Sequence, residues 1–140
     1  MELHKDEISL AGLQSIAIGL GEAKHARHYC GKLAPSLNCL TSETNDAYYT
    51  YGLRQGTLSE GIANAFNIAK VSAKAMVNGH AQGRSTGDIR MIPGTFIIDQ
   101  KGIIRYAHYN RYAGDDPEIS DLISVANLLL AVIKIQAQKV

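Results

Sequence analysis

The chain has 140 residues, a formal net charge of +1 and 46% hydrophobic residues. This length allows one domain with a hydrophobic core, and we assign residues 1–140 to a single domain. A charge this close to zero offers no field for nucleic acid, and no apolar run reaches membrane-spanning length, so both are excluded as partners. The first seven residues are mostly charged, unlike a signal peptide, so we expect a soluble cytoplasmic protein.

The first part of the chain alternates helical and strand patterns. The expected elements are a helix over 2–11, a strand over 13–20, a helix over 21–33, a strand over 37–40 and a helix that starts at Asn45. Gly12 closes the first of these helices and Pro35 ends the second. This alternation is typical of an α/β fold with a parallel sheet.

A longer helix is expected over residues 57–78. Thr57 and Glu60 form a capping-box pattern at its start. Its apolar residues follow helical spacing and are Leu58, Ile62, Phe66, Ala69, Ala73 and Met76. A glycine-punctuated loop follows over 78–87. The final helix begins with Asp116 as N-cap and Pro117 in the first turn, and it runs to the C-terminus.

The region between these helices predicts a β-hairpin. Residues 95–98 are short, β-branched and aromatic, which suits a buried strand. Residues 99–102 place Asp first and Gly last, a type I turn pattern, and 103–109 return as the antiparallel partner. Pro93 stands directly before a central strand. A cis Ile92–Pro93 bond would provide the sharp bend that this position needs.

A proline followed by such a hairpin resembles the thioredoxin fold. The segments that carry the resemblance are residues 12–19, 29–40, 48–53 and, most specifically, 93–105. Together they are similar to the peroxiredoxin-like branch, the alkyl hydroperoxide reductase/thiol-specific antioxidant proteins. The resemblance implies a thioredoxin-like α/β fold with a cis-proline. It also implies a thiol-dependent antioxidant oxidoreductase without a cofactor, which acts on a peroxide or on a protein thiol or disulfide.

The chain departs from this family at the nucleophile. The family places a Cys-containing turn between a central strand and the N-terminus of the first helix, where the helix dipole lowers the thiol pKa. This chain starts inside or just after that position and contains no Cys-x-x-Cys. We therefore expect a fold truncated at its N-terminus and little activity of this chain alone. The alternative is a non-catalytic module that binds extended segments in a groove at Ile92, Pro93 and Thr95.

The two cysteines are the remaining redox candidates. Without an export signal, two thiols are expected to be reduced. Cys30 lies on the apolar face of its helix, near the negative end of the dipole, so the simple interpretation is a packed thiol. Cys39 lies in a short strand near the side where ligands gather in open α/β sheets, so a redox or resolving role is open for it. A bond between Cys30 and Cys39 is conceivable across Pro35.

Two other motifs carry no function in this interpretation. His25 and His28 have the spacing of a metal site, but no third ligand lies nearby in sequence, so a polar helix face is expected and no metal. Residues 79–86 resemble a phosphate loop only faintly, because they follow a helix and have Arg in place of Lys.

A homodimer is expected from two features. The missing strand would leave the strands over 13–20 and 95–98 with unpaired backbone groups, which could pair with each other or exchange with a second copy. The final helix also has more apolar surface than one face can bury. The alternative is a monomer in which the helix over 57–78 covers the final helix.

Overall fold

The computed structural model describes residues 1–77 and 87–137, which form the expected α/β alternation. In chain order the elements are η1 (Glu2–His4), α1 (Lys5–Leu10), β1 (Ile16–Leu20), α2 (Ala23–Leu33), β2 (Asn38–Ser42), α3 (Asp46–Thr50), α4 (Leu58–Ala63), α5 (Ala65–Val77), β3 (Gly94–Ile98), β4 (Ile104–Tyr109) and α6 (Ile119–Ala137). The predicted loop over 78–87 lies, except for Gly87, outside the described residues, as does the motif over 79–86.

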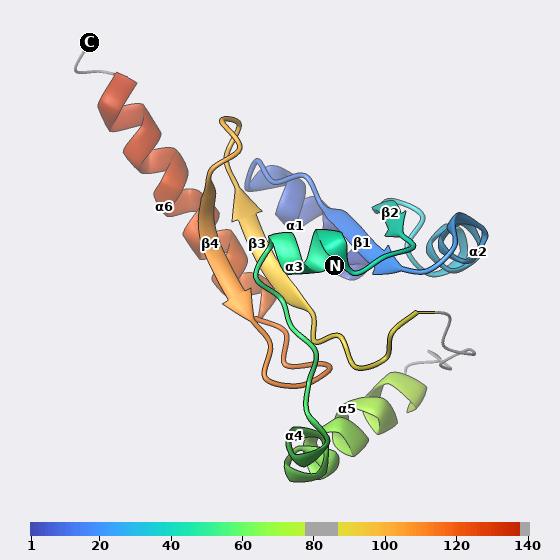
Figure 1. Cartoon of the computed structure of the whole chain (residues 1–140). Coiled ribbons are helices and arrows are strands. Elements are labelled where there is room, and N and C mark those ends of the chain that lie inside the picture. Colours follow the sequence, from blue (N-terminus) through green and yellow to red (C-terminus); the bar gives the residue numbers. More distant parts are fainter. Residues whose placement is uncertain (78–86, 138–140) are drawn as a thin grey trace.

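The described strands form two separate ladders. β1 and β2 pair in parallel, with Ile16 opposite Asn38. β3 and β4 pair in antiparallel orientation, with Gly94 opposite Tyr109. Within the described residues no backbone pairing joins β1 to β3, so these two strands do not close the sheet by pairing with each other. In Figure 1 the hairpin lies between α6 and the β1–β2 ladder.

The hairpin turn is built as its sequence predicts. The Gly102 amide donates to the Asp99 carbonyl at 2.9 Å, and Gly102 has a φ of +78°, which glycine adopts without strain. The Asp99 carboxylate also accepts from the amides of Lys101 at 2.8 Å and Ile103 at 3.0 Å. These amides, that of Ile103 foremost, and the neighbouring Arg105 lower the pKa of Asp99. The turn therefore fixes the register of the hairpin.

The expected cis bond before Pro93 is wrong: the Ile92–Pro93 peptide is trans, as are the other described peptides. The bend lies earlier in the chain, where the Met91 amide donates to the Asp88 carbonyl at 3.1 Å. Met91 then forms an antiparallel bridge with Gln55. Because the chain has already turned at Asp88, it can enter β3 through a trans proline.

The single helix expected over 57–78 is divided at Asn64 into α4 and α5. Its start is confirmed, since Thr57 and Glu60 form a reciprocal capping box. The Asn64 side chain donates to the Glu60 carbonyl at 2.9 Å. The Asn64 backbone has a φ of −101° and a ψ of 6°, which depart from helical values and account for the break. We call α4 and α5 together the arm.

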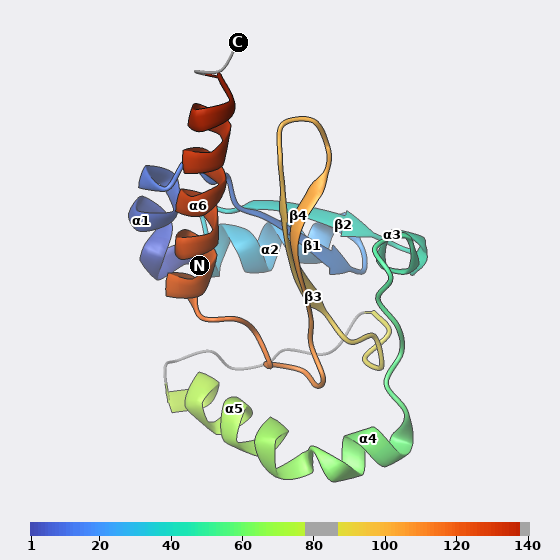
Figure 2. The same ribbon diagram turned by 90° about the vertical axis from the view of Figure 1, so that its left-hand side faces the viewer.

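The core is small and lies on one side of the molecule. Its buried apolar residues are Ile8, Ala11, Met91, Ile97, Leu122 and Ala126. They come from α1 and its C-cap, the approach to β3, β3 itself and α6, and α1 packs on α6. Figure 2 shows the arm extending below this core, on the opposite side from the free end of α6. The alternative to a dimer is a monomer in which the helix over 57–78 covers the final helix. In this structure the arm does not cover α6.

Candidate functional site

The two cysteines are bonded to each other, so the expectation of reduced thiols is wrong for this structure. Cys30 lies in the last turn of α2 and Cys39 in β2, with their Cα atoms 6.4 Å apart. Two short contacts bring them together. The Ala34 amide caps the helix on the Cys30 carbonyl at 2.8 Å, and the Leu37 amide donates to Ala34 at 3.0 Å. This tight turn folds the end of α2 back over β2.

The sulfur pair lies between two hollows of about 320 and 240 Å³. Both cysteines are half-buried and line both hollows, together with Ala26 and Thr41. Arg27 lines the larger hollow, and it precedes Cys30 by three residues on the same helix face. The disulfide is therefore within reach of a molecule that enters either hollow.

The electrostatic setting differs between the two sulfurs. Cys30 is in the last turn of α2, where the helix dipole is negative and disfavours a thiolate. Cys39 belongs to a strand and has no such penalty. The Arg27 guanidinium adds a positive charge to the hollow that both residues line. If the bond were reduced, Cys39 would be the better nucleophile.

The groove predicted at Ile92, Pro93 and Thr95 has its backbone groups largely occupied. The Ile92 amide donates to the Arg54 carbonyl at 3.0 Å, and the Pro93 carbonyl accepts from Asn110 at 3.2 Å. Thr95 stands opposite His108 in the β3–β4 ladder. A peptide could pair with these groups only by displacing bonds within the chain.

Asn110 is a residue that the sequence did not single out. It is buried, and its side chain donates to Asp116 at 2.8 Å. Its carbonyl oxygen Oδ1 has no hydrogen-bond partner among the described residues. A buried acceptor without a partner has a desolvation cost of about 1–3 kcal/mol.

Among the described residues, backbone groups without a partner within the ladders lie on the open edges of β3 and β1, and in β3 they belong to the residues next to Pro93 and Thr95. The Asn110–Pro93 bond sets the alternation in the hairpin, so Gly94, Phe96 and Ile98 direct their amides and carbonyls away from β4. The Phe96 ring is fixed between Tyr51 and Tyr109, with centroid distances of 5.2 and 5.5 Å. Strand alternation in the sequence could have identified Gly94, Phe96 and Ile98 as the residues with outward backbone groups, once the pairing of β3 with β4 was known.

β1 has a matching open edge. The bond from the Gly21 amide to the Ser42 carbonyl continues the ladder. The backbone amides and carbonyls of Ile16, Ile18 and Leu20 therefore point away from β2. On this edge the Tyr48 hydroxyl donates to the Ile18 carbonyl at 2.9 Å. Partial burial raises the pKa of Tyr48, which keeps the hydroxyl protonated as a donor. Tyr48 thus occupies one acceptor of the edge.

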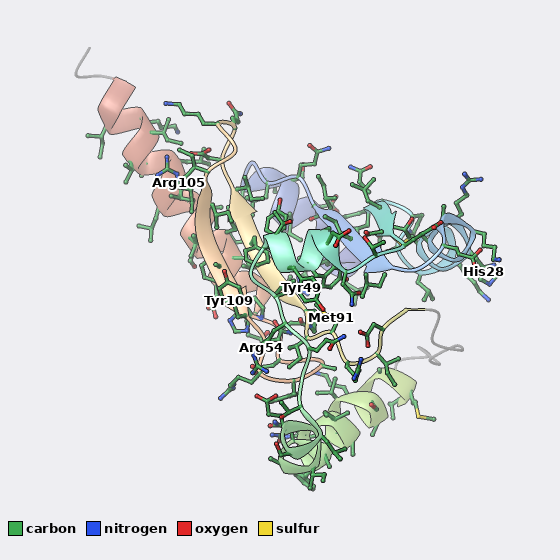
Figure 3. All side chains as sticks on the ribbon, in the orientation of Figure 1. His28, Tyr49, Arg54, Met91, Arg105 and Tyr109 are labelled. Atoms are coloured by element: carbon green, nitrogen blue, oxygen red, sulfur yellow. A yellow bond between two sulfur atoms is a disulfide. The ribbon has the colours of Figure 1, made fainter. Side chains whose placement is uncertain are left out.

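Asp88 ties the two ladders together. Its carboxylate accepts from the side chains of Gln55 and Asn45 and from the Arg90 amide, the last at 3.0 Å. These donors, the Arg90 amide foremost, lower the pKa of Asp88. Figure 3 shows Arg54 and Met91 at the same junction, where the chain leaves the body toward the arm. Asp88 therefore holds the approach to β3 against the start of α3.

The described residues supply no further ligand to the spacing of His25 and His28, for which a polar helix face is expected. His28 lies at the outer side of α2, far from the hairpin (Figure 3), and the side chain of His25 is outside the described set. No group of three metal-binding side chains occurs in the described part of the chain. Among the helices of that part, none combines the length and apolarity that crossing a bilayer requires.

Comparison with known proteins gives one match. A family model described as AhpC/TSA antioxidant enzyme matches residues 1–112, which is most of the chain. The match includes both cysteines, both ladders and the arm. No curated protein and no solved structure matches the chain.

Proposed function

Because the chain belongs to the AhpC/TSA antioxidant enzyme family, we propose that it is a thiol-dependent oxidoreductase in which Cys30 and Cys39 cycle between disulfide and dithiol. The observation that carries this proposal is the bond between the two residues, half-buried and bordered by two hollows. The substrate class is a protein thiol or disulfide, with a peroxide as a slower oxidant.

Reduction begins when a thiolate of a dithiol reductant attacks one sulfur of the pair. A new disulfide forms with the reductant, the Cys30–Cys39 bond breaks, and the departing sulfur takes up a proton. The second thiol of the reductant then attacks the mixed disulfide. The reductant leaves as a disulfide, and both cysteines are left as thiols.

Oxidation by a peroxide proceeds through Cys39. Its thiolate attacks a peroxide oxygen, becomes a sulfenic acid and releases an alcohol or water. The Cys30 thiol then attacks the sulfenic sulfur, which restores the disulfide and releases the sulfenic oxygen as water. This half is slow because neither cysteine lies at a helix N-terminus, where the dipole would lower the thiol pKa. The chain alone is therefore a weak peroxidase.

The test is to follow the free thiols of the purified chain. Reduction with dithiothreitol should expose two thiols per chain, and glutathione disulfide should remove them faster than hydrogen peroxide does. Cys39→Ser should leave one thiol that does not return to an internal disulfide. A bond that dithiothreitol cannot open in the folded chain contradicts the proposal. Rapid peroxide turnover that Cys39→Ser abolishes would contradict the weak peroxidase activity expected of the chain alone.

A matched pair of charge variants tests the local chemistry. Arg27→Gln removes the positive charge from the larger hollow and should slow exchange at neutral pH severalfold, because less thiolate is present. Lys24→Gln removes the same charge from α2 at a residue that does not line the hollow and pairs with Glu22. Equal rates for the two variants would show that Arg27 does not act on the sulfur pair.

A second candidate function is a non-catalytic module that binds an extended peptide. The unpaired edges of β1 and β3 favour it, because such edges accept an added strand. An alternating Thr-Val peptide is a suitable probe. Ile18→Pro removes an outward amide from β1 and should abolish binding, whereas Ile18→Val retains it. If the disulfide cycles and the peptide does not bind, this candidate fails.

A further inference from the structure

The chain exposes more surface than a compact protein of its size. Its accessible surface is 10350 Å². A compact monomer of 15.1 kDa is expected to expose about 7,000 Å². The excess is about 3,000 Å² per chain, and an obligate homodimer buries roughly 1,000–2,500 Å² on each partner. A second copy could therefore cover most of this excess.

One uncovered surface is the free end of α6. Leu122 and Ala126 bury one face of the helix. Leu128, Val132 and Ile135 recur at helical spacing on another face, and they are 67%, 50% and 55% exposed. The same face carries Asp121 and Ser124 nearer the start, so it changes from polar to apolar along the helix. Figure 1 shows this end extending beyond the hairpin. We call Leu128, Val132 and Ile135 the helix-end stripe.

The other uncovered surface is on the arm. On one side of the arm Ile68 and Ala75 are half-buried, and Val71 lies against Gly114. The predicted apolar face points elsewhere: Ile62 is 71% exposed and Phe66 81% exposed. With Leu58 and Met76 they form what we call the arm stripe. The arm therefore turns its more apolar face away from its own chain.

We propose that a second copy of this chain covers both surfaces, the arm stripe of each copy packing on the helix-end stripe of the other. The two stripes are apolar, so neither selects a charged partner, and a net charge of +1 gives little repulsion between copies. The arm and the free end of α6 lie on opposite sides of one chain (Figure 2), which prevents contact between the two stripes within it. A reciprocal exchange about a two-fold axis buries both at once and closes the assembly. The proposal does not depend on the sulfur chemistry.

Sedimentation of the purified chain at micromolar concentration is the first test. A dimer is expected, and either a folded monomer or an open series of larger species overturns the proposal. Leu128→Glu/Val132→Glu and Ile62→Lys/Phe66→Lys should each raise the dissociation constant at least a hundredfold. Ser124→Glu and Asn67→Lys each place one charge of the same sign beside a stripe and should leave the dimer intact. Circular dichroism confirms that each variant is folded.

Mixing the two charged variants tests the reciprocal contact. The acidic helix end of one chain then meets the basic arm of the other, while the second contact has both natural stripes. A one-to-one mixture should form a dimer although each variant alone is a monomer. If α6 of one copy packed instead on α6 of the other, each mixed pair would still place an acidic helix end against a natural one. Mixing would then not restore the dimer. A mixture that stays monomeric therefore overturns the reciprocal arrangement.

Discussion

In the half of the molecule around the β3–β4 hairpin, Met91 and Ile97 are buried, together with Leu122 and Ala126 of α6. In the other half, no side chain of β1, α2 or β2 among those that the structure describes is buried. That half instead has a covalent bond between Cys30 and Cys39. One half is thus held by apolar burial and the other by a cross-link. Redox conditions should affect only the second.

The difference also bears on function. The hairpin half contains the buried side chains, so it keeps its shape when one contact is lost, since burial of each apolar side chain contributes about 1.5–3 kcal/mol. The β1–α2–β2 half has no such buried side chains, so opening its disulfide should loosen the hollows on both sides. Local opening of this kind is where substrate access is expected in a redox protein. The hairpin half would serve as the rigid frame.

The largest expected effect on stability comes from the half around the β3–β4 hairpin, which contains the buried side chains. Leu122→Ala removes a side chain that is 5% exposed where α6 packs on α1. We expect a loss of about 3 kcal/mol of unfolding free energy, from lost burial and the cavity left behind. Leu3→Ala, at a position 93% exposed, is the control and should change stability little. Urea denaturation measures both. Equal losses would refute the placement of the core.

The cross-link gives the next largest effect. The Cys30→Ser/Cys39→Ser variant opens a loop that spans nine residues, and the chain-entropy estimate for such a loop is about 2–3 kcal/mol. Hydrogen exchange should quicken in β1, α2 and β2 and stay unchanged in β3 and β4. Reduction of the natural chain should give the same pattern. Faster exchange in the hairpin would show that the two halves are not independent.

The sequence predicted the hairpin well because its signals are local. Asp99 and Gly102 determine the turn, and Thr57 and Glu60 determine the start of α4, each through contacts within a few residues. The disulfide depended on how the chain turns between α2 and β2, and sequence spacing does not give that distance. The cis-proline prediction failed because Asp88, earlier in the chain, makes the bend. The groove at Ile92, Pro93 and Thr95 remains a prediction.

The arm shows a different limit. Helical spacing correctly grouped its apolar residues, but it could not say which face meets the body. Phe66 is exposed and Ile68 is half-buried, so the predicted face is the outer one. A periodic pattern identifies an apolar face; its partner depends on tertiary or quaternary contacts.

A smaller effect is expected at the open edge of β1. Tyr48→Phe removes the hydroxyl that donates to the Ile18 carbonyl. Loss of one such bond should cost about 1 kcal/mol, since the carbonyl can then bond to water. The change should be greater after reduction of the disulfide, because this edge then depends more on Tyr48. Thermal unfolding under oxidising and reducing conditions measures the difference, and Tyr49→Phe is the control on the same helix. If Tyr48→Phe changed the unfolding temperature equally in oxidising and reducing conditions, the stability of this edge would not depend on the disulfide.

The smallest effect concerns the joint between the body and the arm. Glu60 bonds to Arg54 at 2.6 Å and accepts from the Thr57 amide at 2.8 Å. The Arg54 bond is the main cause that lowers the pKa of Glu60 from 4.5 to about 2. A carboxyl with a depressed folded pKa stabilises the fold above its unfolded pKa, and that contribution is lost as the pH falls from about 4.5 towards 2.

Glu60→Gln should therefore lower the unfolding midpoint slightly at neutral pH. The gap between the variant and the natural chain should shrink as the pH falls through this window. Glu43→Gln is the control, an exposed carboxyl outside the joint. Because both groups of the Arg54–Glu60 pair are partly exposed, about 0.15 M salt should already weaken the effect. A gap that stays constant from pH 6 to about pH 2 would show that the Glu60 charge does not stabilise the joint. The capping box would then act through its neutral hydrogen bonds, and the arm would be held to the body without help from Arg54.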